Sequence, residues 1–321
     1  MSARKEKYLG LSGGVGGAKL CLGLAQILSP EDVAFVVNTG DDFEHMGLHI
    51  SPDIDTLTYT LSGLSNPELG WGRNNETWNF IEAIKQLGGE SWFNLGDADL
   101  AMHILRTEML QSGVSLTEAT HKLTRNVGIE HTILPMSNDP VRTVVHSADG
   151  DLAFQHYFVR DRCEPVISGF SFSGAAKAQI SSQLRAWFDD PDLCGVVICP
   201  SNPYVSIDPL FSVPEFGDWL CSTDVPVVAV SPIVGGEAIK GPTAKMMAEL
   251  AVPASAEAVA SHYLDKIDGF ILDECDAELE TAIRGLGIET TVAHTVMVTL
   301  TDRIELAKTA IDLVRRINNG N

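Results

Sequence analysis

This sequence lacks several features that would place it in a particular class of protein. No stretch contains the ~18 consecutive apolar residues that a membrane-spanning helix needs. The polar start, Met-Ser-Ala-Arg-Lys-Glu-Lys, has no apolar signal core. The six cysteines form no Cys-x-x-Cys pair, a pattern typical of reduced core cysteines in a cytosolic protein. We therefore expect a cytoplasmic protein that does not interact with membranes.

Basic residues are also scarce. The 22 Lys and Arg residues stand against 43 Asp and Glu, which gives a formal net charge of −21. A surface of this sign repels nucleic acid and anionic membranes, so we expect neither as a partner. A ligand that carries phosphate would need local compensation from main-chain N–H groups, a few Lys or Arg side chains, or a metal ion.

Short apolar runs alternate with longer amphipathic segments near both ends of the chain, which is the pattern of βαβ units. The runs are almost continuously apolar, as expected for parallel strands that are buried on both faces. We predict an α/β protein with a Rossmann-like three-layer core and a mainly parallel sheet. Its strands are expected at residues 8–11, 33–37, 195–199, 225–230, 270–272 and 290–293.

The middle of the chain has a different pattern. Helical segments are followed by alternating stretches at 132–134, 142–146 and 153–158, which indicate an antiparallel element. We predict that residues 66–170 form an inserted helical and antiparallel lobe over the strand ends. The core would then consist of residues 1–65 and 171–321.

A glycine-rich segment, "GGVGGAK" at 13–19, follows the first predicted strand. It does not fit a G-x-G-x-x-G fingerprint, because Lys19 stands where the last glycine is required. It does not fit a Walker A loop either, because Ala18 precedes Lys19 and Leu20 follows it. The glycines would still let main-chain N–H groups approach a phosphate at the start of the next helix, with Lys19 in its first turn. The alternative is a tight turn that uses glycine for space. We predict that phosphate is bound by Gly13, Gly14, Gly16, Gly17 and Lys19.

Four carboxylates follow the second predicted strand, in "NTGDDFEHMGLHISPDIDTLTYTL" at 38–61. The carboxyl ends of parallel strands are where ligands bind, and carboxylates beside a phosphate would repel it unless a cation lay between them. Mg²⁺ takes such oxygen ligands, whereas His45 and His49 alone do not make a zinc site. The alternative is a helix cap and a solvated turn. We predict that the four carboxylates, Asp41, Asp42, Asp53 and Asp55, hold a metal ion such as Mg²⁺ or bind a hydroxyl group of the ligand.

The chain resembles the 2-phospho-L-lactate transferase (CofD) family in motifs spread along most of its length. These are the loop at 13–19, "NTGDD" (38–42), "SPDIDT" (51–56), "GWGRNNETW" (70–78), "WFNLGDADLAMH" (92–103), "LPMSNDPV" (134–141), "PSNPYVSI" (200–207), "VSPIVGG" (230–236) and "GPTAKMM" (241–247). The resemblance implies a Rossmann-like core with an inserted lobe, Mg²⁺ dependence and a homodimer.

The resemblance also implies a reaction, in coenzyme F-420 biosynthesis. A phospholactyl, phosphoenolpyruvyl or phosphoglyceryl unit would pass from a guanosine diphosphate ester to the ribityl hydroxyl of the deazaflavin FO, with release of GMP. A guanylyltransferase would supply the donor. No motif separates the three acids.

The family's functional positions can be carried over to this sequence. Asp41 and Asp55 match metal and catalytic positions, and Asp55 and Asn94 match positions that contact FO. Asp55 could therefore orient or deprotonate the ribityl hydroxyl. The turn after the strand at 195–199 would bind the nucleotide, unless it is only a capped polar turn; its residues are Ser201, Asn202, Pro203 and Ser206.

Two further features concern the predicted lobe. Many family members have Arg at the position of Ala98, so a phosphate or carboxylate contact made by that Arg is missing here. Asp99 and His103, four residues apart, share one face of a predicted helix, either as a functional pair or as a cap and a satisfied core histidine. One or two aromatic residues should line an apolar slot for the tricyclic acceptor, from Trp71, Trp78, Trp92, Phe93, Phe170 and Phe172.

Two other functions fit parts of the sequence. A nucleotide-sugar-binding regulatory protein of the YvcK type would share the fold and the glycine-rich start, but its second-strand motif runs Asp-Asp-Gly-Gly-Ser. The second acidic pair found here, Asp53 and Asp55, favours the transferase. An NAD-dependent oxidoreductase would need the dinucleotide fingerprint that this loop does not match.

Overall fold

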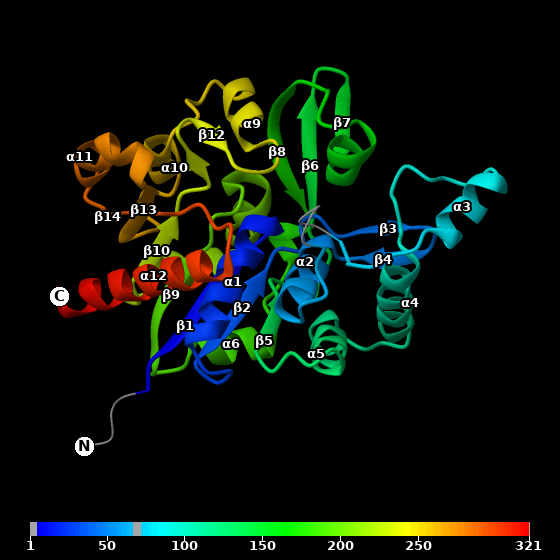
Figure 1. The fold of residues 1–321 in the computed structure, drawn as a ribbon, viewed down its shortest axis with the longest axis horizontal. Helices are drawn as coiled ribbons and strands as arrows, with labels where there is room; N and C mark the ends of the chain where they lie inside the picture. The colour runs from blue at the N-terminus through cyan, green and yellow to red at the C-terminus, as the bar shows by residue number, and fades with distance from the viewer. Residues whose placement is uncertain (1–4, 67–71, 321) are drawn as a thin grey trace.

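A seven-stranded sheet forms the centre of the computed structural model, which describes residues 5–66 and 72–320 (Figure 1). Its strands are β1 (Lys7–Ser12), β2 (Val33–Val37), β5 (Thr132–Pro135), β9 (Leu193–Ile198), β10 (Val227–Val230), β13 (Gly269–Asp273) and β14 (Glu289–Ala293). The order across the sheet is β14-β13-β10-β9-β1-β2-β5, and every neighbouring pair is parallel. The predicted Rossmann-like core with a mainly parallel sheet is confirmed.

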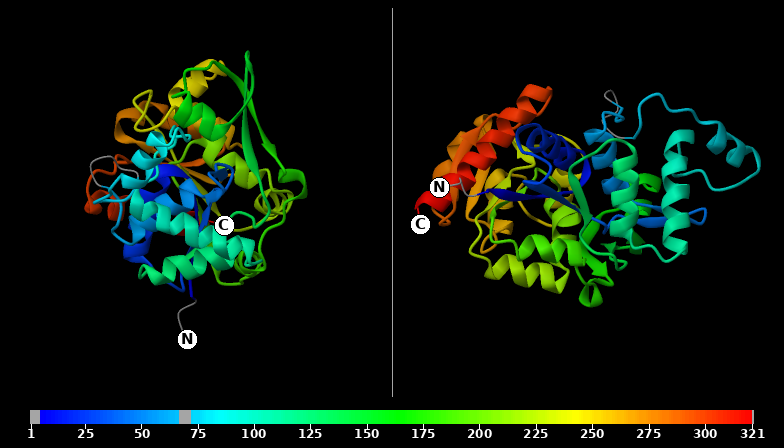
Figure 2. Two further views of the ribbon diagram at one scale, coloured as in Figure 1. Left: turned by 90° about the vertical axis from the view of Figure 1, so that its right-hand side faces the viewer. Right: turned by 90° about the horizontal axis from the view of Figure 1, so that it is seen from below.

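Helices cover both faces of this sheet, which explains the continuous apolar runs in its strands (Figure 2). Along β2, Val33, Phe35 and Val37 pack into one apolar cluster, and Ala34 and Val36 pack into another. Each fully buried Val or Phe side chain contributes about 1.5–3 kcal/mol to folding. One face is covered by α1 (Gly14–Ile27), α2 (Pro52–Leu61) and α12 (Leu300–Gly320), and the other by α6 (Ser182–Phe188), α7 (Asp208–Phe211), α8 (Pro214–Ser222), α9 (Thr243–Glu249), α10 (Ala256–His262) and α11 (Glu280–Arg284).

The remaining elements form the helical and antiparallel part of the molecule. They are the hairpin β3 (Phe43–His45) and β4 (Leu48–Ile50), the helices α3 (Asn79–Gln86), α4 (Asp97–Gln111) and α5 (Leu116–Asn126), and the sheet formed by β6 (Arg142–Ser147), β7 (Gly150–Ala153) and β8 (Ile167–Ser173). A two-stranded ribbon, β11 (Ile233–Val234) and β12 (Glu237–Ala238), lies in the loop after β10. In Figure 1, α3 and the β3–β4 hairpin project to the right of the central sheet. None of the described helices is long and apolar enough to cross a bilayer.

Two of the stretches expected in the antiparallel element lie elsewhere. The strand at 132–134 is the edge strand β5 of the central sheet, because Ile133 and Leu134 pack into the apolar clusters on its two faces. The segment 66–170 therefore contributes one strand to the core sheet. The stretch 153–158 leaves β7 for a short π-helix, His156–Arg160, and the buried side chains of Phe154 and Tyr157 are three residues apart rather than two.

Candidate active site

A cavity of about 1010 Å³ opens at the carboxyl ends of β1, β2 and β9. The chain runs from β1 to β2 on one side and from β9 to β10 on the other, so the strand order reverses here, as at the ligand sites of open α/β sheets. The cavity is lined by most of the predicted site residues: Gly13, Gly14, Gly16, Lys19, Asp41, Asp53, Asp55, Asn94, Ser201, Asn202 and Ser206. Gly17 and Pro203 do not line it. A Cβ on Gly17 would lie 2.5 Å from the Ser12 Oγ atom, and Pro203 is buried in a π-helix, Pro203–Ile207.

The glycines of the loop serve two purposes. A Cβ on Gly16 would lie 2.3 Å from the Pro200 carbonyl oxygen, and a Cβ on Gly13 would lie 2.5 Å from the Ser206 Cβ, so both positions need glycine for close packing. Gly14 instead has a φ of +64° and open space around it, which leaves the loop's main chain facing the cavity. The packing and phosphate-binding interpretations of the loop are therefore compatible.

The helix α1 begins at Gly14. Lys19 therefore lies in its second turn rather than in the first turn predicted from the sequence. The Lys19 ammonium donates a hydrogen bond of 2.9 Å to the carbonyl oxygen of Met297. Burial lowers the pKa of Lys19, and the nearby charges of Arg303 and Lys240 lower it further. Lys19 is thus held at the wall of the cavity by the segment before α12.

Asp53 joins the acidic segment to the glycine loop. It lies in the first turn of α2, where its Oδ1 accepts a 2.7 Å hydrogen bond from the Gly14 N–H. Its Oδ2 accepts a 2.9 Å hydrogen bond from the Asn38 side chain, at the end of β2. The next first-turn N–H groups of α1, at Val15 and Gly16, have no intrahelical partner.

Asp41 and Asp53 form a buried acidic pair at the cavity. Burial raises the pKa of Asp53 to about 6. Burial and the neighbouring charge of Asp53 raise the pKa of Asp41. Neither carboxylate forms an ion pair with a basic side chain of the described residues, and Asp41 Oδ1 has no hydrogen-bond partner among them. Such a pair, made only of oxygen donors, fits a divalent cation such as Mg²⁺.

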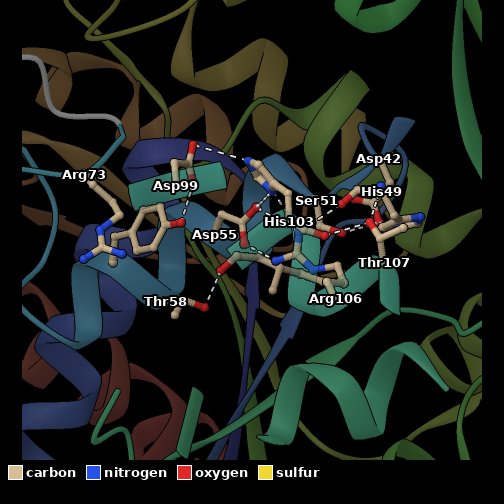
Figure 3. Close-up of polar contacts among 12 residues, drawn as sticks. Asp42, His49, Ser51, Asp55, Thr58, Arg73, Asp99, His103, Arg106 and Thr107 are labelled. Carbon is tan, nitrogen blue, oxygen red and sulfur yellow. Dashed lines mark hydrogen bonds and ion pairs between the residues drawn. The ribbon is translucent and has the colours of Figure 1, made fainter. Parts of the chain in front are cut away.

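Asp55 has a different environment from Asp41 and Asp53. Both of its carboxylate oxygens bind the guanidinium of Arg106, a buried residue of α4 (Figure 3). Burial raises the pKa of Asp55, although Arg106 and His103 act in the opposite direction. Nothing in the sequence around Arg106 indicated this pairing, since it joins residues that are 51 positions apart.

Asp99 and His103 extend this network toward the cavity. The Tyr59 hydroxyl donates to Asp99 Oδ1, and His103 Nε2 lies 3.4 Å from Asp99 Oδ2 (Figure 3). His103 Nδ1 lies 3.6 Å from Asp55 Oδ2, so His103 lies between the two carboxylates. Burial alone would raise the pKa of Asp99, but the adjacent His103 and the hydrogen bond from Tyr59 lower the value below the usual one. The i, i+4 pair noted in the sequence thus contacts Asp55.

Asp55, Asp99 and His103 could themselves hold a metal ion, because one ligand atom from each lies within 4.8 Å of the others. However, the Arg106 guanidinium already neutralises Asp55, and a divalent cation there would be repelled by it. The Asp41–Asp53 pair has no such compensation. For this reason we favour the acidic pair as the metal site.

The remaining polar residues of the acidic segment have partners within the protein, although Asp42 Oδ1 and His45 Nε2 have no hydrogen-bond partner among the described residues. Asp42 accepts a 2.8 Å hydrogen bond from Ser51 and lies 3.1 Å from His49 Nε2. His45 packs at 5.0 Å against the ring of Trp92. These histidines are therefore engaged in packing and hydrogen bonding at the β3–β4 hairpin.

The loop after β9 holds the glycine loop in place. The Ser201 hydroxyl accepts a 3.1 Å hydrogen bond from the Gly13 N–H and donates a 2.7 Å bond to the Gly13 carbonyl oxygen. Asn202 Oδ1 caps the following π-helix by accepting from the Tyr204 N–H at 3.0 Å. The predicted nucleotide contacts of Ser201 and Asn202 would thus be made by residues that also have structural roles.

Part of the cavity wall is aromatic. It is lined by Phe93, Trp78, Phe154 and Phe158, with Asn94 exposed beside Phe93. Trp92 lies behind them against Phe43, at a ring distance of 5.9 Å. Phe170 and Phe172 instead pack at the main apolar cluster, and Trp71 lies outside the described residues. Five further residues that line the cavity were not predicted as site residues from the sequence: Tyr59, Arg73, Phe154, Phe158 and Lys240.

Comparison with known proteins places this geometry in a family. The family model described as 2-phospho-L-lactate transferase CofD matches residues 9–308. The chain belongs to the CofD family. A 2-phospho-L-lactate transferase from Methanosarcina mazei is 39% identical over 300 residues, covering 94% of this chain and 98% of that protein. A phosphoenolpyruvate transferase from Kitasatospora aureofaciens is 36% identical over 321 residues, covering 98% and 99%.

Membership of the CofD family makes this protein a transferase. Its relatives carry two substrate names at similar identity, so overall identity does not separate phospholactate from phosphoenolpyruvate. Among solved structures, a UPF0052 family protein from Bacillus halodurans matches with a TM-score of 0.64 at 13% identity, covering 97% of this chain and all of that one. That likeness shows the shared fold alone.

Proposed function

We propose that this protein moves a phospho-organic-acid unit from a guanosine diphosphate ester to the ribityl hydroxyl of FO, as a step in coenzyme F-420 biosynthesis. The observation that carries the proposal is the arrangement along one cavity. A glycine loop at a helix N-terminus, a buried acidic pair and several aromatic side chains all line it. A diphosphate fits the glycine loop, and a flat tricyclic acceptor fits the aromatic side chains.

The donor's diphosphate would lie against the start of α1. The free N–H groups of Val15 and Gly16, together with Lys19, would hold its oxygens. The loop after β9, with Ser201, Asn202, Pro203 and Ser206, would border the guanosine. Ser201 would contribute mainly by keeping Gly13 in place.

Asp41 and Asp53 would hold the magnesium ion, and we place Asp55 outside its immediate ligands because Arg106 binds both of its oxygens. When bound, the ion would neutralise charge on the diphosphate and on the departing GMP. It would also offset the burial that raises the pKa values of both carboxyls and the repulsion of Asp41 by Asp53.

The acceptor would lie against the aromatic side chains, with its ribityl chain toward Asp55 and Asn94. The hydroxyl oxygen attacks the phosphorus that carries the acid, a new P–O bond forms, and the bond from that phosphorus to the GMP oxygen breaks. GMP leaves with the bonding electrons, and the hydroxyl proton is lost. Asp55, fixed by Arg106, would orient the hydroxyl rather than move freely.

The test is incubation with FO, GTP, a guanylyltransferase and each of three phospho-acids in turn: phospholactate, phosphoenolpyruvate and phosphoglycerate. Mass spectrometry should detect a deazaflavin that carries one of the three acid units. Tight GDP binding with no product from any of the acids would instead favour a nucleotide-binding regulatory protein. We further propose a cytoplasmic homodimer, which light scattering of the purified protein would test.

A further inference from the structure

Arg73 occupies an unusual position beside Tyr59 of α2. Its guanidinium carbon lies 5.6 Å from the centre of the Tyr59 ring, and its Nη1 donates a 3.3 Å hydrogen bond to the carbonyl oxygen of Ala98. Figure 3 shows its side chain beside the Tyr59–Asp99 contact, on the side away from Arg106. Arg73 also lines the cavity.

The Arg73 side chain has unused donors. It forms no ion pair with any described acidic residue, although the chain has 43 Asp and Glu residues. Its Nε is buried and has no hydrogen-bond partner among the described residues. A guanidinium carries five N–H donors in a planar fork, and only one contact of this fork is made within the described protein. A buried donor of this kind is expected to have a partner, which points to a ligand.

Two other cations near the cavity have partners within the protein. Lys19 donates to the Met297 carbonyl beside the glycine loop, and Arg106 binds Asp55. Unlike Arg106, Arg73 has no acidic partner among the described residues.

The distance along α2 indicates which substrate Arg73 meets. Asp53 holds Gly14 of the phosphate loop, and Tyr59 lies six residues further along the helix, about 9 Å at 1.5 Å per residue. The carboxylate of the transferred acid lies only a few bonds from the reacting phosphorus, so it stays near the loop. The acceptor's ring lies beyond its ribityl chain and can reach Tyr59.

We propose that Arg73 is a specificity-determining residue for the acceptor, and this inference rests on the proposed function. With Tyr59 beneath it, the guanidinium donates to electron-rich oxygens on the edge of the acceptor's ring system, such as ring carbonyls or an ionised phenol.

The test measures FO and GDP binding separately by titration calorimetry. Arg73→Gln should weaken FO binding about tenfold or more, as expected for the loss of hydrogen bonds from a charged donor, and Arg73→Lys should recover part of this. GDP affinity should change less than about twofold, and KM for FO should rise more than kcat falls. Arg125→Gln, at an exposed position of α5, is the matched control.

The outcomes separate the two proposals. Unchanged FO affinity in a folded Arg73→Gln protein overturns the inference, and so does an equal loss of GDP affinity, which would move Arg73 to the donor. If the wild-type protein does not bind FO at all, the proposed acceptor is wrong and the role of Arg73 is rejected with it. Melting temperatures within a few degrees of wild type show that the variants are folded.

Discussion

The Oδ1 atom of Asp53 accepts a 2.7 Å hydrogen bond from the main-chain N–H of Gly14. This contact joins the first turn of α2 to the first turn of α1, and it places a carboxylate next to the loop that should receive a diphosphate. A negative side chain at this place disfavours an anionic ligand unless a cation is also present. The contact therefore links phosphate binding to metal binding.

Asp53→Asn tests this link. The Asn oxygen can still accept from Gly14, although the bond from Asn38 is lost, so the loop should keep its conformation while the charge is removed. In EDTA, GDP should bind to this variant at least as tightly as it binds to the wild type. Added Mg²⁺ should no longer increase the affinity of the variant for GDP. Calorimetry measures the GDP affinity with and without Mg²⁺, and Asp149→Asn, at an exposed position, is the control. A full Mg²⁺ effect in Asp53→Asn would remove this residue from the metal site.

Asp41→Ala should raise the Mg²⁺ concentration needed for half-maximal transfer. The expectation follows from the burial of Asp41 and from its Oδ1, which has no hydrogen-bond partner among the described residues. Losing one of two carboxylate ligands should increase this concentration about tenfold or more. A Mg²⁺ titration of the initial rate gives the value. An unchanged requirement would place the ion elsewhere, and the cluster of Asp55, Asp99 and His103 would be the next candidate.

Metal binding should depend on pH. In the metal-free protein the pKa of Asp53 is about 6, above its ordinary value of 3.8, so this carboxyl keeps its proton to a higher pH than in the unfolded chain. Mg²⁺ must displace that proton, so its affinity should be greatest above pH 6 and fall about tenfold per unit below it. The stability of the metal-free protein depends on pH in the opposite direction. Between about pH 4 and pH 6 the folded protein keeps a proton on Asp53 that the unfolded chain loses, so the metal-free fold becomes less stable as pH rises.

Calorimetric titration with Mg²⁺ between pH 5 and pH 7.5 measures this dependence. Asp53→Asn should flatten the part of the curve that belongs to this carboxyl. Equal Mg²⁺ affinity at both ends of the range would show that no protonated carboxyl competes with the ion.

Asp55→Asn should impair both activity and folding stability. The substitution leaves the buried guanidinium of Arg106 without its charge partner, a change that typically costs about 3–5 kcal/mol. The double variant Asp55→Asn, Arg106→Gln should recover much of the stability but not the activity. Urea unfolding of the two single variants and the double variant forms a cycle, and a coupling energy near zero would contradict the buried pair.

Two glycines of the loop, Gly14 and Gly16, should respond differently to replacement by alanine. Gly16→Ala places a Cβ against the Pro200 carbonyl oxygen and should destabilise the fold. Gly14→Ala meets no atom, so its cost is the left-handed conformation, about 1–2 kcal/mol, and its main effect should be on GDP affinity. Thermal unfolding and GDP titration of both variants distinguish these roles. Equal losses of stability would contradict the assignment.

Periodicity predicted the core well, because strands buried on both faces leave long apolar runs. The run at 33–37 coincides with β2, and the helix predicted to carry Asp99 and His103 is α4. The run at 132–134 was misassigned, since three residues do not show whether a strand is parallel or antiparallel. The pairing with β2 is a property of the whole sheet.

At the site, the glycine loop and acidic segment were found because both follow strands whose ends meet. The partners of those residues were not predictable. The Asp55–Arg106 pair and the Arg73–Tyr59 stack join helices and loops that are far apart in sequence, and no local pattern indicates such contacts. The structure therefore changes the interpretation of Asp55 from a free carboxylate to one held by a buried cation.

The most direct test of the central claim is a single turnover with the purified guanosine diphosphate ester, FO, Mg²⁺ and an excess of this protein. We predict that GMP and the acid-bearing deazaflavin form at the same rate and in equal amounts, and that EDTA stops both. Release of GMP without a deazaflavin product would mean that water rather than FO accepts the phosphoryl group. Formation of neither product from any of the three esters would contradict the proposed transfer.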